Sequence, residues 1–381
     1  MRIPLFAMER MQSTWENLVD YNLSESGVHP MRVEELLDDA TDREGLLGQE
    51  LVYAQSNGTI GLRERVAAMY PGATVEHVEI TNGGSEANFV TMWHLLEPGD
   101  EVVCMVPNYG QTLGLADVFG GVLKPWPLRL SPDGRRWGVD LDSLRVLVTA
   151  RTRVVILCNP DNPTGARIPA ADLDAICAVA GRVGAWVVSD EIYRGAELDG
   201  VETPSVWGRY ERAVITSGLS KAYGLPGLRI GWIVGPAPTV AATWSHHDYT
   251  TIAPGTLSDR LARVALQPAT RARILARTQR ILRANLPVIT DWLDAHRDRF
   301  TYVPPEAGAI VYVRYADSIN STKLVDRLRV EKSVLIVPGD HFGMDGYLRI
   351  GFGSETRYLR DGLDRLADLL RSLPGPAATT A

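Results

Sequence analysis

The sequence predicts an α/β protein with a large domain, whose mainly parallel sheet is flanked by helices, and a smaller α+β domain. Short apolar runs alternate with helical patterns through the middle of the chain. An arginine-rich periodic stretch begins near residue 270, and a second group of apolar runs follows it. Strand–helix alternation is typical of parallel sheets, and 381 residues exceed what one simple core accommodates.

The central sheet is expected from six apolar runs rich in β-branched residues. Their nearly unbroken apolarity is typical of strands covered on both faces. The expected strands are 77–81, 101–106, 153–158, 185–190, 213–217 and 229–234, and the helical patterns between them include 60–70, 86–96 and 170–183.

The smaller domain is expected to follow a long connecting helix over about 270–300. Strands are expected at 309–315, 333–337 and 347–351, and a helix at 355–372. We therefore divide the chain into an N-terminal arm with part of the small domain (1–45), a large domain (46–270) and a C-terminal small domain (271–381). The tail 374–381 is expected to be disordered.

Composition and charge argue against several classes of partner. The formal net charge of −7 does not favour nucleic acid or anionic membranes. No run of eighteen apolar residues and no signal peptide is recognised, so a cytoplasmic enzyme is expected. Cys104, Cys158 and Cys177 are widely spaced in apolar runs and are expected to be buried, with no metal site.

Two polar segments follow predicted strands at the sheet edge where α/β proteins bind ligands. In Thr81-Asn-Gly-Gly-Ser-Glu-Ala87, the residues Gly84, Ser85 and Glu86 open a helix and could cradle a phosphate, or form an ordinary turn with Ser85 as cap. In Cys158-Asn-Pro-Asp-Asn-Pro-Thr-Gly165, two prolines fix the backbone around Asn162, which could also be only a rigid turn.

Two further segments carry charged groups. Asp190 ends an apolar run, where a carboxylate needs a proton or a cation unless it caps a helix or is solvated. In Ser217-Gly-Leu-Ser-Lys-Ala-Tyr-Gly-Leu-Pro-Gly-Leu-Arg-Ile-Gly-Trp232, Lys221 lies among small and apolar residues, which suits a lysine for Schiff-base chemistry. Arg229 follows as a natural phosphate partner.

This last string resembles the lysine signature of fold-type I aminotransferases of class I/II, the aspartate aminotransferase superfamily, and the other motifs fall in that family's order and spacing. The resemblance implies a pyridoxal 5′-phosphate (PLP) cofactor. Lys221 would form its Schiff base and move a proton at the substrate, while Asp190 would keep the pyridine nitrogen protonated. Asn162 and Tyr193 would hydrogen-bond the phenolate oxygen, and Tyr109 would stack on the ring.

The resemblance also matches Arg229 to the phosphate arginine, next to the phosphate cradle expected at Gly84, Ser85 and Glu86. One position departs from the family, which often has Ser or Thr where this chain has Gly218. Either Ser217 or Ser220 compensates, or that contact is missing.

For the substrate, the resemblance implies that Arg349 binds the α-carboxylate, with Gly27 as a backbone contact and Asn162 close by. Tyr53 resembles the tyrosine that reaches the phosphate in a partner subunit. The chain is therefore expected to form a homodimer with shared active sites, and its small-molecule substrates are expected to be an amino acid and a 2-oxo acid.

Transamination is the plainest reaction, and two alternatives remain open. The segment Glu25-Ser-Gly-Val-His29, with the lysine string, is similar to capreomycidine synthase and related cyclases, which carry out elimination and ring closure on a hydroxylated arginine. His29 would then be an acid or base and Glu25 a guanidinium partner; alternatively, His29 only caps a turn. A non-enzymatic regulatory role is the third alternative, although no DNA-binding segment accompanies the motifs.

Other histidines have no assigned role. His246 and His247 are adjacent on a predicted helix and point to different faces, which argues against a shared metal. Tyr249 and Thr250 behind them are expected near the domain junction and the substrate pocket. His341 could shape the side-chain pocket or support its loop.

Overall fold

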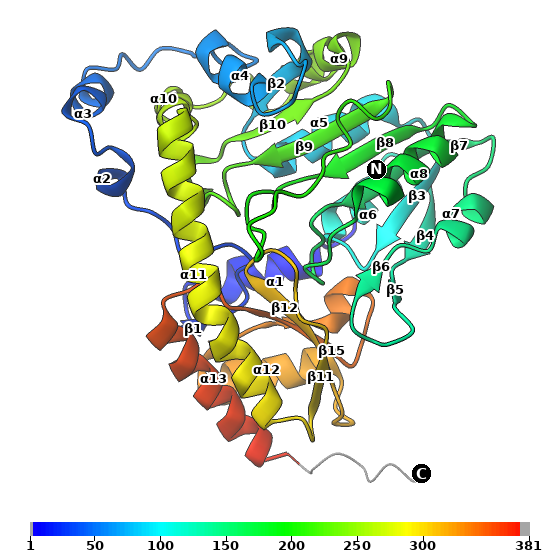
Figure 1. Cartoon of the computed structure of the whole chain (residues 1–381), viewed down its shortest axis with the longest axis vertical. Coiled ribbons are helices and arrows are strands. Elements are labelled where there is room, and N and C mark those ends of the chain that lie inside the picture. The colour runs from blue at the N-terminus through cyan, green and yellow to red at the C-terminus, as the bar shows by residue number, and fades with distance from the viewer. Residues whose placement is uncertain (1–2, 374–381) are drawn as a thin grey trace.

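The computed structural model describes residues 3–373. Its larger lobe is built on a seven-stranded sheet, which can be followed in Figure 1. The strand order is β2-β10-β9-β8-β7-β3-β4, and β10 alone runs antiparallel to its two neighbours. The strands are β2 (Val78–Thr81), β3 (Glu101–Val106), β4 (Val122–Pro127), β7 (Thr152–Cys158), β8 (Trp186–Asp190), β9 (Ala213–Gly218) and β10 (Gly231–Val234). The predicted α/β class with a mainly parallel sheet is confirmed.

Helices cover both faces of this sheet, and successive strand residues therefore enter two different cores. In β7, Val154 and Ile156 pack with α5 and α6, whereas Val155 and Leu157 pack with α8 on the other face. This explains the continuous apolar runs. The elements of this lobe are α4 (Ile60–Ala67), η1 (Val75–His77), α5 (Gly84–Leu95), α6 (Gly110–Val118), the hairpin β5 (Arg129–Leu130) and β6 (Trp137–Gly138), α7 (Leu141–Leu147), α8 (Ala170–Gly181), η2 (Pro226–Leu228), α9 (Ala237–His247) and α10 (Thr256–Ala265).

The smaller lobe is a four-stranded antiparallel sheet, β11-β12-β15-β14, packed with helices. Its elements are α11 (Pro268–Ala295), β11 (Phe300–Tyr302), β12 (Ile310–Tyr315), α12 (Ser321–Lys332), β13 (Val334–Leu335), β14 (Val337–Pro338), η3 (Gly339–Phe342), β15 (Tyr347–Gly351) and α13 (Thr356–Arg371). The expected connecting helix is α11, which runs alongside both lobes in Figure 1.

The N-terminal segment contributes to both lobes. It contains α1 (Ala7–Trp15), β1 (Tyr21–Asn22), α2 (Val33–Leu36) and α3 (Ala40–Leu47). Strand β1 pairs in parallel with β13 of the smaller lobe, whereas α3 contacts α10 of the larger one. The domain boundaries at residues 45 and 270 stay a prediction.

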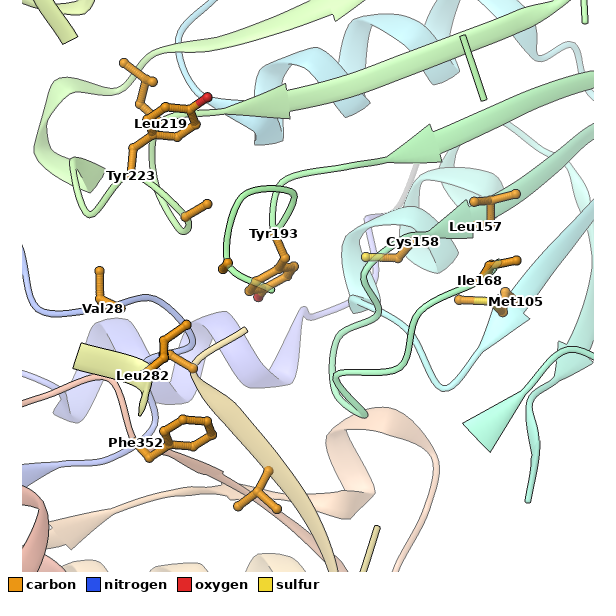
Figure 2. Close-up of a cluster of buried hydrophobic side chains, with 14 of the residues drawn as sticks. Val28, Met105, Leu157, Cys158, Ile168, Tyr193, Leu219, Tyr223, Leu282 and Phe352 are labelled. Atoms are coloured by element: carbon orange, nitrogen blue, oxygen red, sulfur yellow. The ribbon is translucent and has the colours of Figure 1, made fainter. Parts of the chain in front are cut away.

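A single apolar cluster connects the lobes (Figure 2). Leu282 of α11, Phe352 after β15 and Val28 of the N-terminal segment belong to the same cluster as Tyr193 and Leu219 of the larger lobe. Leu282 and Phe352 are fully buried. Truncating such a leucine to alanine costs about 2–5 kcal/mol, so this cluster fixes how the lobes meet.

Cys104, Cys158 and Cys177 are free and buried. Within residues 3–373, none of the helices combines the length and apolarity needed to cross a membrane. The tail 374–381, expected to be disordered, lies outside the described residues.

Candidate active site

A cavity of about 290 Å³ lies beyond the carboxyl ends of β7, β8 and β9 and brings together most of the predicted residues. This is the edge at which α/β sheets bind ligands. The predicted residues that line it are Glu25, Gly84, Ser85, Tyr109, Asn162, Asp190, Tyr193, Ser220, Lys221, Arg229 and Arg349. A wider hollow of about 570 Å³ between the β5–β6 hairpin and the start of α8 holds none of them.

Lys221 lies in the turn after β9, close to the N-terminal segment. Its Nζ is 3.6 Å from Oε2 of Glu25, and the positive charge of Lys221 lowers the pKa of that carboxyl against the opposing effect of burial. A Cβ at Gly27 would lie only 3.3 Å from the Ser220 carbonyl oxygen and 3.4 Å from Cα of Lys221. Gly27 therefore packs against the backbone of Lys221, which explains why a glycine suits this position.

Asp190 ends β8 with its carboxylate facing the cavity. Oδ1 accepts a hydrogen bond from the Ile192 backbone N–H at 3.0 Å, and Oδ2 accepts one from Nδ2 of Asn88 at 3.2 Å. Burial raises the pKa of Asp190, and these two donors and the charge of Lys221 oppose that rise. The carboxylate is thus held in a fixed orientation and would be stabilised further by a cationic ligand. Asn88 of α5 is a site residue that the sequence did not single out; Thr216 donates to its Oδ1 at 2.6 Å and orients it.

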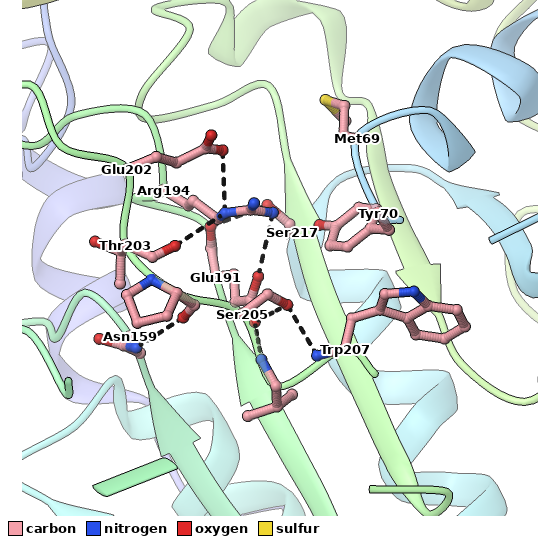
Figure 3. Close-up of polar contacts among 12 residues, drawn as sticks. Met69, Tyr70, Asn159, Glu191, Arg194, Glu202, Thr203, Ser205, Trp207 and Ser217 are labelled. Carbon is pink, nitrogen blue, oxygen red and sulfur yellow. Dashed lines mark hydrogen bonds and ion pairs between the residues drawn. The ribbon is translucent and has the colours of Figure 1, made fainter. Parts of the chain in front are cut away.

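A second buried network of hydrogen bonds and ion pairs surrounds Glu191, in the turn that follows β8 (Figure 3). Oε1 of Glu191 accepts a hydrogen bond from Ser205 at 2.7 Å, and Oε2 is 3.8 Å from Arg194, which also pairs with Glu202. Burial raises the pKa of Glu191 to about 7, while Arg194 opposes that rise. Ser217 donates to the Glu191 carbonyl oxygen at 3.1 Å and so points away from the cavity.

Arg349 joins the two lobes at the far side of the cavity. It lies on β15, is almost fully buried, and donates from Nη1 to Oδ1 of Asn162 at 2.8 Å and from Nη2 to the Ser24 carbonyl oxygen at 2.6 Å. Its Nε has no partner among the described residues. Because buried donors are normally paired, this guanidinium retains capacity for a carboxylate ligand. Tyr193 donates to Ser26 at 2.8 Å beside it.

The opposite end of the cavity suits a phosphate. Helix α5 begins here, and Gly83 before it has φ of +87°, which favours glycine. A Cβ at Gly231 would collide with the backbone of Gly83 and Gly84, so β10 approaches this turn closely. Arg229, in a left-handed conformation, donates to the Pro226 carbonyl oxygen at 2.9 Å and lies 3.4 Å from Ser220. A helix N-terminus with an arginine is a favourable environment for an anion.

Besides Gly27, the predicted residues that lie away from the cavity lining include Glu86, His29 and Tyr53. Glu86 turns from it to contact His247 at 3.2 Å. His29 lies with its Nδ1 3.1 Å from Arg277 of α11, and burial and that arginine lower its pKa. Tyr53 is 85% exposed. Their roles at the site stay predictions.

Helix α1 contributes cavity residues that the sequence analysis missed. Glu9, Gln12 and Glu16 line the cavity, and their spacing places them on one helix face. Oε1 of Glu9 accepts a hydrogen bond from the Tyr109 hydroxyl at 2.7 Å. Burial, followed by the charges of Glu25 and Glu9, raises the pKa of Glu16. The i, i+3, i+7 spacing of these polar residues was the available signal.

The fold and this cavity define a PLP-dependent enzyme, and the comparisons agree. The chain belongs to the aminotransferase class I and II family, which matches residues 20–366. A capreomycidine synthase from Streptomyces vinaceus is 33% identical over 357 residues, covering 92% of this chain and 89% of that protein. An arginine–pyruvate transaminase from Pseudomonas aeruginosa is 28% identical, covering 88% and 86%. The crystal structure of a PLP-dependent aminotransferase from Streptococcus suis has a TM-score of 0.92 at 30% identity, covering 99% of this chain and 100% of that one.

The cofactor of this enzyme is PLP, and the described residues fit it. The cavity has a lysine, a buried carboxylate that would be stabilised by a cation, and an anion-binding helix end beside an arginine. These match the aldehyde, the pyridinium nitrogen and the phosphate of that molecule, respectively.

Proposed function

We propose that this enzyme transfers the amino group of an α-amino acid with a cationic side chain to a 2-oxo acid. The observation that carries the proposal is the surplus of carboxylates in the cavity. Asp190 would pair with the cofactor ring, and Arg229 and Arg349 with the phosphate and the substrate carboxylate. Glu9, Glu16 and Glu25 then remain, with only Lys221 among them as a cation.

A cationic substrate side chain would neutralise this surplus. The raised pKa of Glu16 reflects burial and the charges of Glu25 and Glu9, and a guanidinium placed among them would relieve that repulsion. A guanidinium also presents several N–H donors, which suits carboxylates arriving from different directions. The arginine–pyruvate transaminase among the relatives acts on a substrate of this class by its name.

Each of the cavity residues would have a distinct role in this reaction. Bound PLP supplies an electron sink that weakens the bonds at the substrate Cα. Nζ of Lys221 would carry the proton to and from that Cα, because Lys221 is the lysine that lines the cavity. Asp190 would hold a proton on the pyridine nitrogen, and Tyr193 and Asn162 would orient the ring oxygen. Arg349 would fix the α-carboxylate and so the orientation of the Cα bonds.

Elimination and cyclisation of a hydroxylated arginine is the second candidate function. The relative named capreomycidine synthase favours it, as does the position of Glu25, 3.6 Å from Nζ of Lys221, where a carboxylate could hold a guanidinium close to the proton-transferring group. Both candidates use the same cationic substrate class.

One experiment separates the two. The PLP-loaded enzyme is mixed with arginine or with 3-hydroxyarginine in the absence of any oxo acid, and the products are identified by mass spectrometry. A 2-oxo acid formed in an amount equal to the enzyme supports transamination. A product lighter than hydroxyarginine by one water molecule, formed over many turnovers, supports elimination and cyclisation. Reaction with neutral amino acids but with neither compound would refute the cationic substrate class.

We also propose that the enzyme is a homodimer with shared sites. Large apolar side chains are exposed on two adjacent segments, which include Leu51, Val52 and Tyr53 in one, and Tyr249 and Ile252 in the other. Thr251 of the second segment contacts the turn before α5 at 2.5 Å, so a second copy seated here would lie close to the phosphate end of the cavity. Sedimentation analysis tests the dimer; a monomer with full activity would refute it.

A further inference from the structure

Behind the turn that opens α5, His247 is enclosed by two carboxylates. It is the last residue of α9, its side chain is fully buried, and α9 packs against both β2 and α5 (Figure 1). Nδ1 lies 3.4 Å from Oε1 of Glu79 on β2, and Nε2 lies 3.2 Å from Oε2 of Glu86 on α5. Nε2 is also 2.9 Å from the hydroxyl of Thr251.

Glu86 is the centre of the contacts that shape this turn. Its Oε2 accepts the backbone N–H of Asn82 at 2.6 Å, and its Oε1 accepts the hydroxyls of Thr250 at 2.6 Å and Thr251 at 2.8 Å. Asn82 in turn donates to Thr251 at 2.5 Å. The turn from Asn82 to Ser85 is therefore held in place by hydrogen bonds to the Glu86 carboxylate and to Thr251, and Thr250 and Thr251 in turn hydrogen-bond Glu86.

The charge of Glu86 creates an electrostatic conflict. It lies in the first turn of α5, the same helix end that faces the cavity through Gly84 and Ser85. A helix N-terminus stabilises one nearby anion, and a second anion at that end repels the first. Without a positive counter-charge, Glu86 would thus weaken the binding of a phosphate there.

We infer that His247 is a positioning residue for the cofactor phosphate, acting as the buried positive counter-charge of Glu86. It draws the Glu86 carboxylate away from the cavity, neutralises it, and leaves the helix end free for the dianionic phosphate. Although burial opposes protonation, Glu79 and Glu86 together raise the pKa of His247 to about 9, so the imidazole is charged at neutral pH. The inference rests on the phosphate placement proposed above.

The test compares two ligands of the apoenzyme, PLP and pyridoxal, which lacks the phosphate. Their dissociation constants are measured by fluorescence titration for the wild type and the His247→Gln variant. We expect His247→Gln to weaken PLP by about 10- to 100-fold while pyridoxal changes little, because the loss is confined to the phosphate end. His246→Gln is the matched control, since His246 lies on the same helix and its contacts among the described residues are with Trp93, His94, Ser245 and the Ala242 carbonyl oxygen rather than with Glu86. An unchanged preference for PLP over pyridoxal in His247→Gln would overturn the inference.

A double variant separates charge from shape. In His247→Gln/Glu86→Gln the negative charge is removed together with its counter-charge, and we expect PLP affinity to return to near the wild-type value. A double variant as weak as His247→Gln would overturn the electrostatic role. If the single variant does not fold, the ring nitrogens of His247 in the wild-type holoenzyme can be followed by NMR, and a neutral ring at pH 7.5 would overturn it equally.

Failure of the phosphate placement itself has a different signature. Arg229→Gln should also lower the preference for PLP over pyridoxal. If neither Arg229→Gln nor His247→Gln changes that preference, the phosphate binds elsewhere. If only Arg229→Gln lowers it, the placement stands and the role of His247 is refuted.

Discussion

Replacing Arg349 by lysine should impair the enzyme only toward substrates that carry an α-carboxylate. The variant keeps the positive charge but loses the planar fork, which in the wild type bonds Asn162 and Ser24 while Nε remains free. A lysine Nζ cannot replace all three donors. A hydrogen bond to a charged group contributes about 1.5–3 kcal/mol, which corresponds to roughly a 10- to 150-fold decrease in kcat/KM.

The assay follows the first half-reaction, without an oxo acid, for the amino acid that reacts fastest and for its decarboxylated amine. Wild type should prefer the amino acid strongly, and Arg349→Lys should lose that preference while the slow reaction of the amine stays unchanged. Arg314→Lys, at an exposed position on the neighbouring strand β12, is the matched control. An equal decrease for both compounds would show that Arg349 acts through the structure of the site and would refute the carboxylate assignment.

Lys221→Ala should abolish covalent capture of PLP after borohydride reduction, and a peptide map that locates PLP on another lysine would refute the assignment. Asp190→Asn should lower kcat by roughly 100- to 1000-fold, because the protonated pyridine nitrogen of PLP would lose its carboxylate partner, while the circular dichroism spectrum should stay unchanged. If sites are shared, Tyr53→Phe should weaken PLP retention in the dimer. Mixed dimers of a Tyr53→Phe subunit and a Lys221→Ala subunit should show partial activity. Unchanged PLP retention in Tyr53→Phe contradicts a shared site. Protonated His247 should stabilise the fold by roughly 3 kcal/mol below pH 6.5, because its pKa is higher in the folded than in the unfolded chain, and this contribution should be lost as the pH rises through about 9. The free energies of unfolding of wild type and His247→Gln, measured by denaturant titration across this range, should therefore converge at high pH.

The sheet was predictable because its central strands are buried on both faces. Strand β3 begins and ends where expected, and β7, β8 and β9 differ by one residue at one end. Strand β4 was missed because it is an edge strand that contains Lys124, Pro125 and Pro127, residues that weaken an apolar pattern but are tolerated at an edge.

The cavity was predictable where its residues occur in local motifs, and unpredictable where the fold brings distant segments together. Asp190 ends one strand and Lys221 lies in the turn after the next, so their position at the sheet edge could be inferred. Glu9 reaches Tyr109 only through the docking of α1, which no local pattern indicates. The expected role of His29 depended on its sequence neighbourhood, and its contact with Arg277 on α11 became visible only in three dimensions.

The separate origin of the two halves of the cavity has a consequence for how this enzyme can diversify. The cavity-lining groups assigned to the cofactor occur between Gly84 and Arg229, whereas the surplus carboxylates all come from the first 25 residues of the chain. We therefore expect selectivity to be transplantable: grafting the leading segment of a relative onto this chain should exchange the preferred amino acid and leave the chemistry at Cα intact.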